Sequence, residues 1–125
     1  MAAKRPIFTE NFSVNLSTIQ TFLGERGTDS YRRLLDRLYD DIIPILCRFP
    51  QAGWSFLAHA VRSTKGKTLA AKLRKRLHPS DDLREFIVDD YLVLYLVRGG
   101  RVLVLSIKHH RQLSFDLKRF WIETV

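Results

Sequence analysis

The sequence predicts an α+β fold in which an N-terminal strand and a helical hairpin pack on a small, mainly antiparallel four-stranded sheet. Two observations lead to this fold class. Apolar residues recur at helical spacing through residues 15–49, whereas residues 83–107 consist of β-rich runs separated by short turns. Since helices followed by strands usually build two layers around one core, we expect the helices on one face of the sheet. The 125 residues suffice for a single domain over residues 1–125.

The first half of the chain reads as a strand followed by two helices. Residues 7–12 contain three apolar side chains and are expected to form a short opening strand. Residues 15–23 place their apolar side chains on one helical face, and Gly24 suits a helix stop. A longer helix is expected at residues 31–49, with a kink at Pro44 because proline removes one backbone donor.

The middle of the chain has weaker signals. Residues 50–53 contain a proline and a glycine and should end the long helix, whereas residues 54–61 fit no regular element clearly. Residues 67–77 are expected to form a helix, because leucines recur there at spacings of four, and residues 78–81 should end it.

The second half of the chain reads mainly as strands. Residues 83–88 alternate in polarity, residues 89–90 mark a turn, and two apolar runs at 91–97 and 102–107 flank a Gly-Gly turn. This last pattern predicts a tight hairpin. Its nearly continuous apolar character implies strands that are covered on both faces. A short amphipathic tail at residues 113–125 follows.

The net charge constrains the class of partner. A formal charge of +8 points to a polyanion, either a nucleic acid or an acidic protein. The densest positive stretch is residues 62–76, with seven basic residues and no acidic one. It is either a solvated helix face or a surface for phosphates or carboxylates. The candidates for nucleic-acid binding in it are Lys65, Lys67, Lys72, Lys75 and Arg76.

The cysteine count and the hydropathy pattern indicate a compartment. The single cysteine, Cys47, excludes an internal disulfide and suits a reducing environment. The longest uninterrupted apolar run, residues 91–97, is too short to cross a bilayer, and no secretory leader opens the chain. We therefore expect a soluble, cytoplasmic protein without a membrane partner.

Three motifs carry a resemblance to a known family. Residues 48–53 read Arg-Phe-Pro-Gln-Ala-Gly, residues 83–86 read Leu-Arg-Glu-Phe before a tyrosine-rich run at 91–95, and residues 107–111 read Ile-Lys-His-His-Arg. In this order and spacing they resemble the RelE/ParE superfamily of bacterial type II toxin–antitoxin toxins. The resemblance extends over residues 7–111.

This resemblance implies a toxin that inhibits growth and is neutralised by a cognate antitoxin. RelE-like members cut messenger RNA in the ribosomal A site, whereas ParE-like members poison DNA gyrase. We favour RNA cleavage on the ribosome, without a metal or another cofactor, because the charge and the His/Arg ending of the last strand suit it. Gyrase inhibition is the first alternative, and a non-catalytic binding module that has kept the fold is the second.

RNA cleavage without a metal needs an acid, a base and cations around the scissile phosphate. Arg84 and Arg111 are the expected cations, and His109 is the expected acid or base because an imidazole titrates near neutrality. His109 is preferred to His110, since only one of the two shares a strand face with Arg111. Lys108 and His110 are expected to contact the nucleic acid.

The arginines also have structural interpretations. Arg84 is equally suited to pair with Asp89 or Asp90 across a turn. Arg98 and Arg101 flank the Gly-Gly turn and are most simply solvated strand ends.

The remaining candidates have structural interpretations too. Tyr91 and Tyr95 are possible stacking partners for a base, but tyrosines in apolar runs are more often core aromatics with a satisfied hydroxyl. Cys47 is expected to be a buried small side chain. The adjacent histidines near residue 110 lack a Cys or carboxylate at ligand spacing, so no zinc site is expected.

Overall fold

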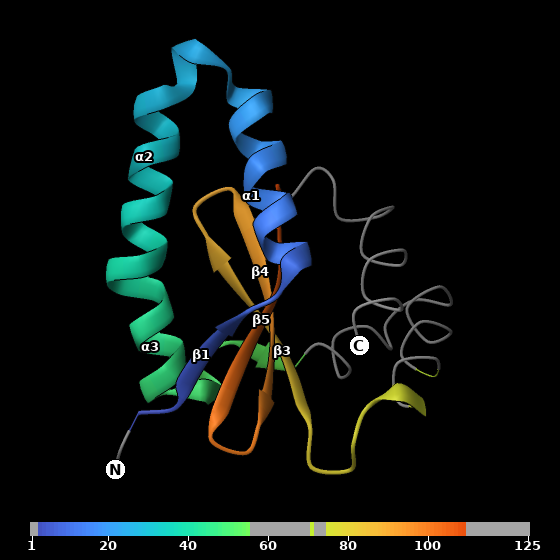
Figure 1. The fold of residues 1–125 in the computed structure, drawn as a ribbon. Helices are drawn as coiled ribbons and strands as arrows, with labels where there is room; N and C mark the ends of the chain where they lie inside the picture. The colour runs from blue at the N-terminus through green and yellow to red at the C-terminus, as the bar shows by residue number, and fades with distance from the viewer. Residues whose placement is uncertain (1–2, 56–70, 72–74, 110–125) are drawn as a thin grey trace.

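The computed structural model describes residues 3–55, 71 and 75–109, and it confirms the predicted α+β fold. Helices lie on one face of a sheet whose five strands run in the order β1-β5-β4-β3-β2 (Figure 1). The sheet therefore has one strand more than the predicted four. The added strand is β2 (Trp54–Ser55), only two residues long, in a segment whose sequence pattern is ambiguous.

The opening strand is shorter than predicted and the first helix is longer. β1 covers Arg5–Phe8 and α1 covers Glu10–Leu23. Between them, the hydroxyl of Thr9 accepts a hydrogen bond from the Phe12 N–H at 3.2 Å and caps the helix. Because this cap starts the helix, Phe12 does not end a strand as predicted, and its side chain is fully buried in the core.

The second arm of the helical hairpin also begins earlier than predicted. Its segments are the 3-10 turn η1 (Glu25–Gly27), α2 (Thr28–Asp36), the π-helical η2 (Arg37–Ile42) and α3 (Ile43–Arg48). Within η2 the backbone bonds span five residues, as where the N–H of Ile43 donates to the carbonyl of Leu38. Pro44 lies in the first turn of α3. The irregularity expected from Pro44 therefore takes the form of the π-helical segment η2, which directly precedes α3.

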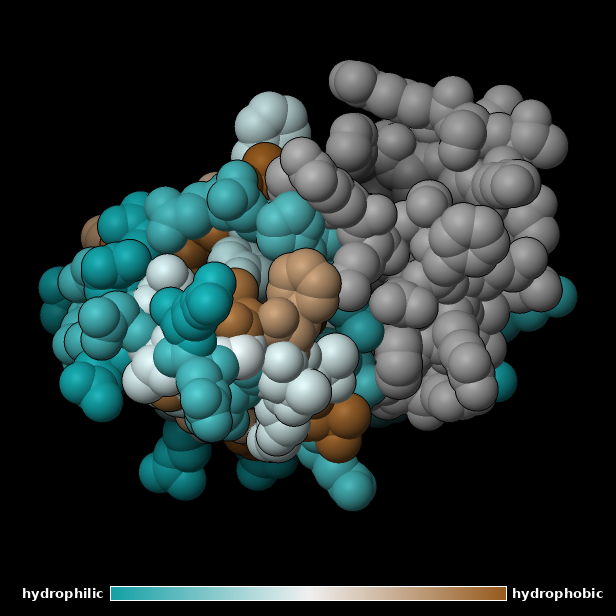
Figure 2. Space-filling model, turned by 90° about the horizontal axis from the view of Figure 1, so that it is seen from above, coloured by the Kyte–Doolittle hydropathy of each residue, from teal (hydrophilic) through white to brown (hydrophobic). Residues whose placement is uncertain are grey.

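The tip of the helical hairpin is mainly polar. Seen from above, it presents mostly hydrophilic side chains, and the hydrophobic ones form separate patches (Figure 2). Phe22, near the end of α1, is 80% exposed. In this view the tip has no extended apolar surface.

The predicted strands of the second half are confirmed. They are β3 (Asp82–Val88), β4 (Tyr91–Arg98) and β5 (Arg101–His109), all antiparallel to their sequence neighbours, while β1 pairs with β5 in parallel. Both predicted turns require a left-handed residue: Asp89 has φ +53° and Gly99 has φ +58°. Of the helix predicted at 67–77, residues 71, 75 and 76 are helical. Residue 77 is a bend, so the helix ends one residue earlier than predicted. The other residues of that helix and the tail at 113–125 lie outside the described residues.

The central strands are buried on both faces, as their apolar runs predict. Val93 and Tyr95 point towards the helices and are fully buried. Leu92, Leu94 and Leu96 point to the opposite face and are at most 8% exposed. Side chains from both faces of β4 therefore contribute to the buried interior.

A bulge in β5 is held by amide side chains of α1. Leu105 has no opposite residue in β4, because the register shifts at this point. Its carbonyl accepts a hydrogen bond from Asn11 Nδ2 at 3.0 Å, and the N–H of Ile107 donates to Asn15 Oδ1 at 3.0 Å. Asn15 is 2% exposed. These two side chains satisfy a carbonyl and an N–H of β5 next to the bulge and fix β5 to the first helix.

Candidate functional site

Arg84, the first predicted catalytic cation, is held by the loop that precedes β2. Its Nε donates to Asp82 Oδ2 at 2.7 Å, and its Nη1 donates to the carbonyl of Gly53 at 2.7 Å. The side chain is 19% exposed. The guanidinium therefore ties the loop after η3 (Pro50–Ala52) to the sheet. The expected pairing with an aspartate of the β3–β4 turn is wrong, because Arg84 lies at the opposite end of β3.

Tyr95 also attaches the loop around Gly53 to the sheet. Its hydroxyl donates to the carbonyl of Pro50 at 2.7 Å and accepts from the N–H of Gly53 at 2.9 Å. Burial raises the pKa of this phenol. A side chain at position 53 would place its Cβ 2.5 Å from the carbonyl of Glu85, which explains the glycine. Tyr95 is thus a core aromatic with a satisfied hydroxyl, which was one of its two predicted roles. Because its ring is fully buried, it cannot stack on a base, which was the other.

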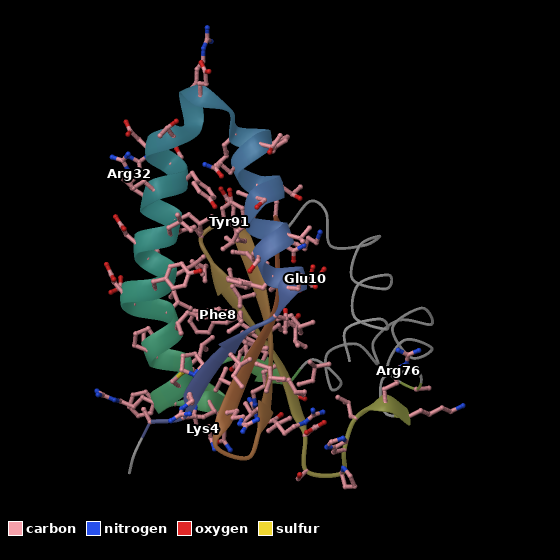
Figure 3. The ribbon with its side chains drawn as sticks, viewed as in Figure 1. Lys4, Phe8, Glu10, Arg32, Arg76 and Tyr91 are labelled. Atoms are coloured by element: carbon pink, nitrogen blue, oxygen red, sulfur yellow. The ribbon has the colours of Figure 1, made fainter. Side chains whose placement is uncertain are left out.

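His109, the predicted acid or base, ends β5 at the other end of the sheet. It is half-buried, and its ring meets that of Tyr91 edge to face at 5.6 Å between centroids. Burial, with the Asp90 carboxylate adding to it, raises the pKa of the Tyr91 hydroxyl. Figure 3 shows Tyr91 towards the end of the sheet that is nearer the tip of the helical hairpin, and Lys4 at the opposite end, where β4 turns into β5.

The structure does not bring Arg84 and His109 together. Arg84 lies opposite Tyr95 in the β3–β4 ladder, and His109 lies opposite Tyr91 in the β4–β5 ladder. The two rows are four residues apart, which is about 13 Å along the strand. The side chain of Val93, which is fully buried, occupies the position between the two rows on this face of β4. No single substrate group can touch both predicted residues.

The other predicted site residues fall into two groups. Lys75 and Arg76 are exposed, and Figure 3 shows Arg76 well away from the sheet. Lys108 is only 7% exposed, so its predicted contact with a nucleic acid has no open surface on which to form. The residues that lie outside the described part of the chain are Lys65, Lys67, Lys72, His110 and Arg111.

A group of cations gathers where β4 turns into β5. We call it the hairpin-end cluster and define it as Lys4, Arg5, Arg48 and Arg101. Arg5 is the ladder partner of Arg101, and Lys4 Nζ donates to the carbonyl of Gly99 at 2.6 Å. Figure 3 shows Lys4 beside this turn. No local sequence motif indicates this cluster, because its members come from three distant segments of the chain.

Arg98 lies beside this cluster but is compensated. Its Nε and Nη2 donate to the two carboxylate oxygens of Asp81 at 2.8 and 2.6 Å. These bonds from Arg98 lower the pKa of Asp81, although burial of the carboxyl acts in the opposite direction. The expectation that Arg98 is only a solvated strand end is therefore wrong.

The described residues offer no metal site. In residues 3–55, 71 and 75–109, no three His, Cys, Asp or Glu side chains are grouped closely enough to hold a metal ion. Cys47 is buried as predicted, and burial raises the pKa of its thiol. None of the helices in this part of the chain is both long and apolar enough to span a membrane.

Comparison with known proteins identifies a family. The family model for the ParE toxin of the type II toxin–antitoxin system parDE matches residues 7–114, which is most of the chain. No curated protein matches the sequence. The match extends from β1 to just beyond the end of β5, so it includes the strands that carry both Arg84 and His109.

Proposed function

The chain belongs to the ParE toxin family of type II toxin–antitoxin systems, and we propose that it stops growth by binding DNA gyrase. Family membership implies an antitoxin as the neutralising partner. The sequence alone favours RNA cleavage on the ribosome, so gyrase replaces messenger RNA as the proposed target. This proposal keeps the toxin function and changes the target.

One observation carries this proposal. A metal-independent ribonuclease needs its acid, its base and its cations around one phosphate, yet Arg84 and His109 lie about 13 Å apart along the sheet with a buried side chain between them. Moreover, two donors of the Arg84 guanidinium are already engaged by Asp82 and Gly53. Its position therefore suits a structural role, which leaves binding to a protein target as the simpler mechanism.

RNA cleavage is the second candidate function, and one observation favours it. His109 ends β5 with its ring partly exposed, and Arg111 follows two positions later in the sequence. A site built from these two residues alone would not need Arg84. His109 as acid or base and Arg111 as cation therefore stay predictions for this second candidate.

Two assays on the purified chain separate the candidates. We expect loss of plasmid supercoiling when gyrase is incubated with the protein, and intact messenger RNA when programmed ribosomes are incubated with it. The matched variant is His109→Ala, which removes the only imidazole among the proposed catalytic residues. It should remain as toxic as the wild type in cells if gyrase is the target.

Cleavage of messenger RNA beside unaffected supercoiling would overturn the gyrase proposal. A non-toxic His109→Ala variant that folds normally would point in the same direction. If the wild-type chain is expressed at a high level and growth is normal, the alternative of a binding module without toxicity gains support. Thermal unfolding of both proteins is the control for folding.

A further inference from the structure

The outer side of η2 and α3 combines exposed apolar side chains with balanced charge. Figure 1 shows this helical arm along one edge of the fold, with the sheet on its inner side. A shallow hollow of about 500 Å³ lies on this outer side, and its exposed apolar lining residues are Pro44, Ile45 and Phe49. Its charged lining residues are two cations and two acids, namely Arg37, Arg48, Asp40 and Asp41. The hollow therefore has no formal net charge, although the whole chain carries +8.

Ile45 and Phe49 are unusually exposed for large apolar residues. Ile45 is 39% exposed and Phe49, which directly follows α3, is 62% exposed, although burial of such side chains normally stabilises a protein. Their neighbours Leu46 and Cys47 are buried in the core, so α3 has apolar side chains on its inner and its outer side. A helix that is apolar on two sides fits a surface that packs against a further partner.

The charged residues beside Ile45 are exposed and unengaged. Asp41 precedes Ile45 by one turn of the helix, and Arg48 follows it by about the same distance. Within the described part of the chain, no ion pair or hydrogen bond holds the carboxylate of Asp41 or the guanidinium of Arg48. An acid, an apolar centre and a cation thus follow one another along the same surface.

This order of charges is complementary to its own reverse. Pro44 and Ile45 lie midway between Asp41 and Arg48 in the sequence. When two copies of this helix pack antiparallel about a two-fold axis at that midpoint, each Asp41 lies opposite Arg48 of the other copy. A partner of a single charge sign, whether an acidic protein segment or a basic one, would instead place one of these charges against its own sign. Charge complementarity therefore selects a second copy of the chain.

We propose that the outer side of η2 and α3 is the interface of a symmetric homodimer. Ile45 packs beside the two-fold axis against its own copy, and two ion pairs between Asp41 and Arg48 form on either side of it. Phe49 follows Arg48 directly and excludes water from each pair. Such an interface is isologous and closes at two copies. The inference does not depend on gyrase being the target, because it concerns only the association of the chain with itself.

Sedimentation equilibrium of the full chain measures the association. We expect a species of twice the 14.6 kDa mass of one chain to accumulate as the protein concentration rises. Asp41→Arg and Arg48→Asp should each raise the Kd of the dimer at least about tenfold, because each variant sets like charges opposite each other twice in one interface. The matched controls are Asp29→Arg and Arg32→Asp, equal changes of charge near the start of α2, which should leave Kd nearly unchanged.

A mixture of the two interface variants is the sharper test. When Asp41→Arg pairs with Arg48→Asp, both contacts again join opposite charges, so the mixture should form heterodimers with a Kd near that of the wild type. Neither variant should do so alone. Damage to the fold, or an interface elsewhere on the molecule, would not be repaired by mixing.

Several results would overturn the proposal. They are a wild-type chain that stays monomeric up to its solubility limit, an equal rise of Kd in the α2 controls, a mixture that stays monomeric, and masses that grow beyond two copies with concentration. Growth beyond two copies would show a head-to-tail contact, which does not close. Circular dichroism confirms that each variant is folded.

Discussion

One ion pair from each end of the sheet allows a comparison, because the two pairs differ in geometry and burial. At the hairpin end, Arg98 binds Asp81 at 2.6 Å, and the Asp81 side chain is 0% exposed. At the opposite end, Arg37 Nε lies 3.6 Å from Asp89 Oδ2, and both side chains are about half exposed or more. When its cation is removed, a buried carboxylate is left without solvation, which is costly. An exposed carboxylate is solvated by water instead. The comparison teaches that, of these two pairs, only Arg98–Asp81 should contribute measurably to stability.

Arg98→Ala is the strongest test of this comparison. We expect the free energy of unfolding to fall by about 2–3 kcal/mol, because Asp81 loses two charge-assisted hydrogen bonds while remaining buried. The loss should be below that of a fully buried pair, since the Arg98 side chain is 35% exposed. Urea unfolding measures it. A change below about 0.5 kcal/mol would remove the distinction between the two ends.

Tyr95→Phe is expected to have the next largest effect. The variant leaves the Pro50 carbonyl and the Gly53 N–H without their partner beneath the loop, at a cost of about 1–2 kcal/mol. Tyr91→Phe is the matched control at the other end, because no hydrogen bond of the Tyr91 hydroxyl is found within the described residues. Equal urea midpoints for the two variants would contradict the interpretation of Tyr95 as the anchor of the loop.

The pH dependence of stability should also originate at the hairpin end. The hydrogen bonds from Arg98 hold the pKa of Asp81 below its ordinary value of about 3.9. Because the folded state prefers the ionised carboxyl, this contribution is complete above about pH 5 and is lost as the pH falls through the lowered pKa. The difference in unfolding free energy between wild type and Asp81→Asn should therefore shrink on acidification. A difference that is constant from neutral to acid pH would refute the assignment.

Arg37→Ala should give the smallest effect. The pair with Asp89 is long and exposed, so its removal should change the free energy of unfolding by no more than about 0.5 kcal/mol. The same urea experiment as for Arg98→Ala provides the comparison. A loss as large as that of Arg98→Ala would show that exposure does not decide the strength of these pairs.

The fold could be predicted well where the determining interactions are local. The Gly-Gly turn and the two apolar runs around it predict the β4–β5 hairpin because turn chemistry and side-chain alternation act over a few residues. Element boundaries were less predictable. Thr9 starts α1 earlier than expected, since its hydroxyl caps the helix, a role that the apolar pattern alone does not indicate.

The candidate site was harder to predict. The sequence predicts Arg84 as a catalytic cation or as a partner of Asp89 or Asp90. Its bond to the carbonyl of Gly53 could not be predicted, because Gly53 is 31 residues away in the sequence. The fifth strand was missed for a similar reason. Two residues, Trp54 and Ser55, are too few to show alternation, and their strand exists only because β3 pairs with them.

The sequence by itself determined the fold class, the hairpin and the resemblance to a toxin superfamily, because residue periodicity and motif order depend on neighbours along the chain. Only the tertiary structure decided which cations are engaged and which are available. The pairing of β1 with β5 sets Arg5 beside Arg101, and the register of β4 keeps Arg84 apart from His109. Such juxtapositions depend on contacts between residues far apart in the sequence, and no local pattern encodes them.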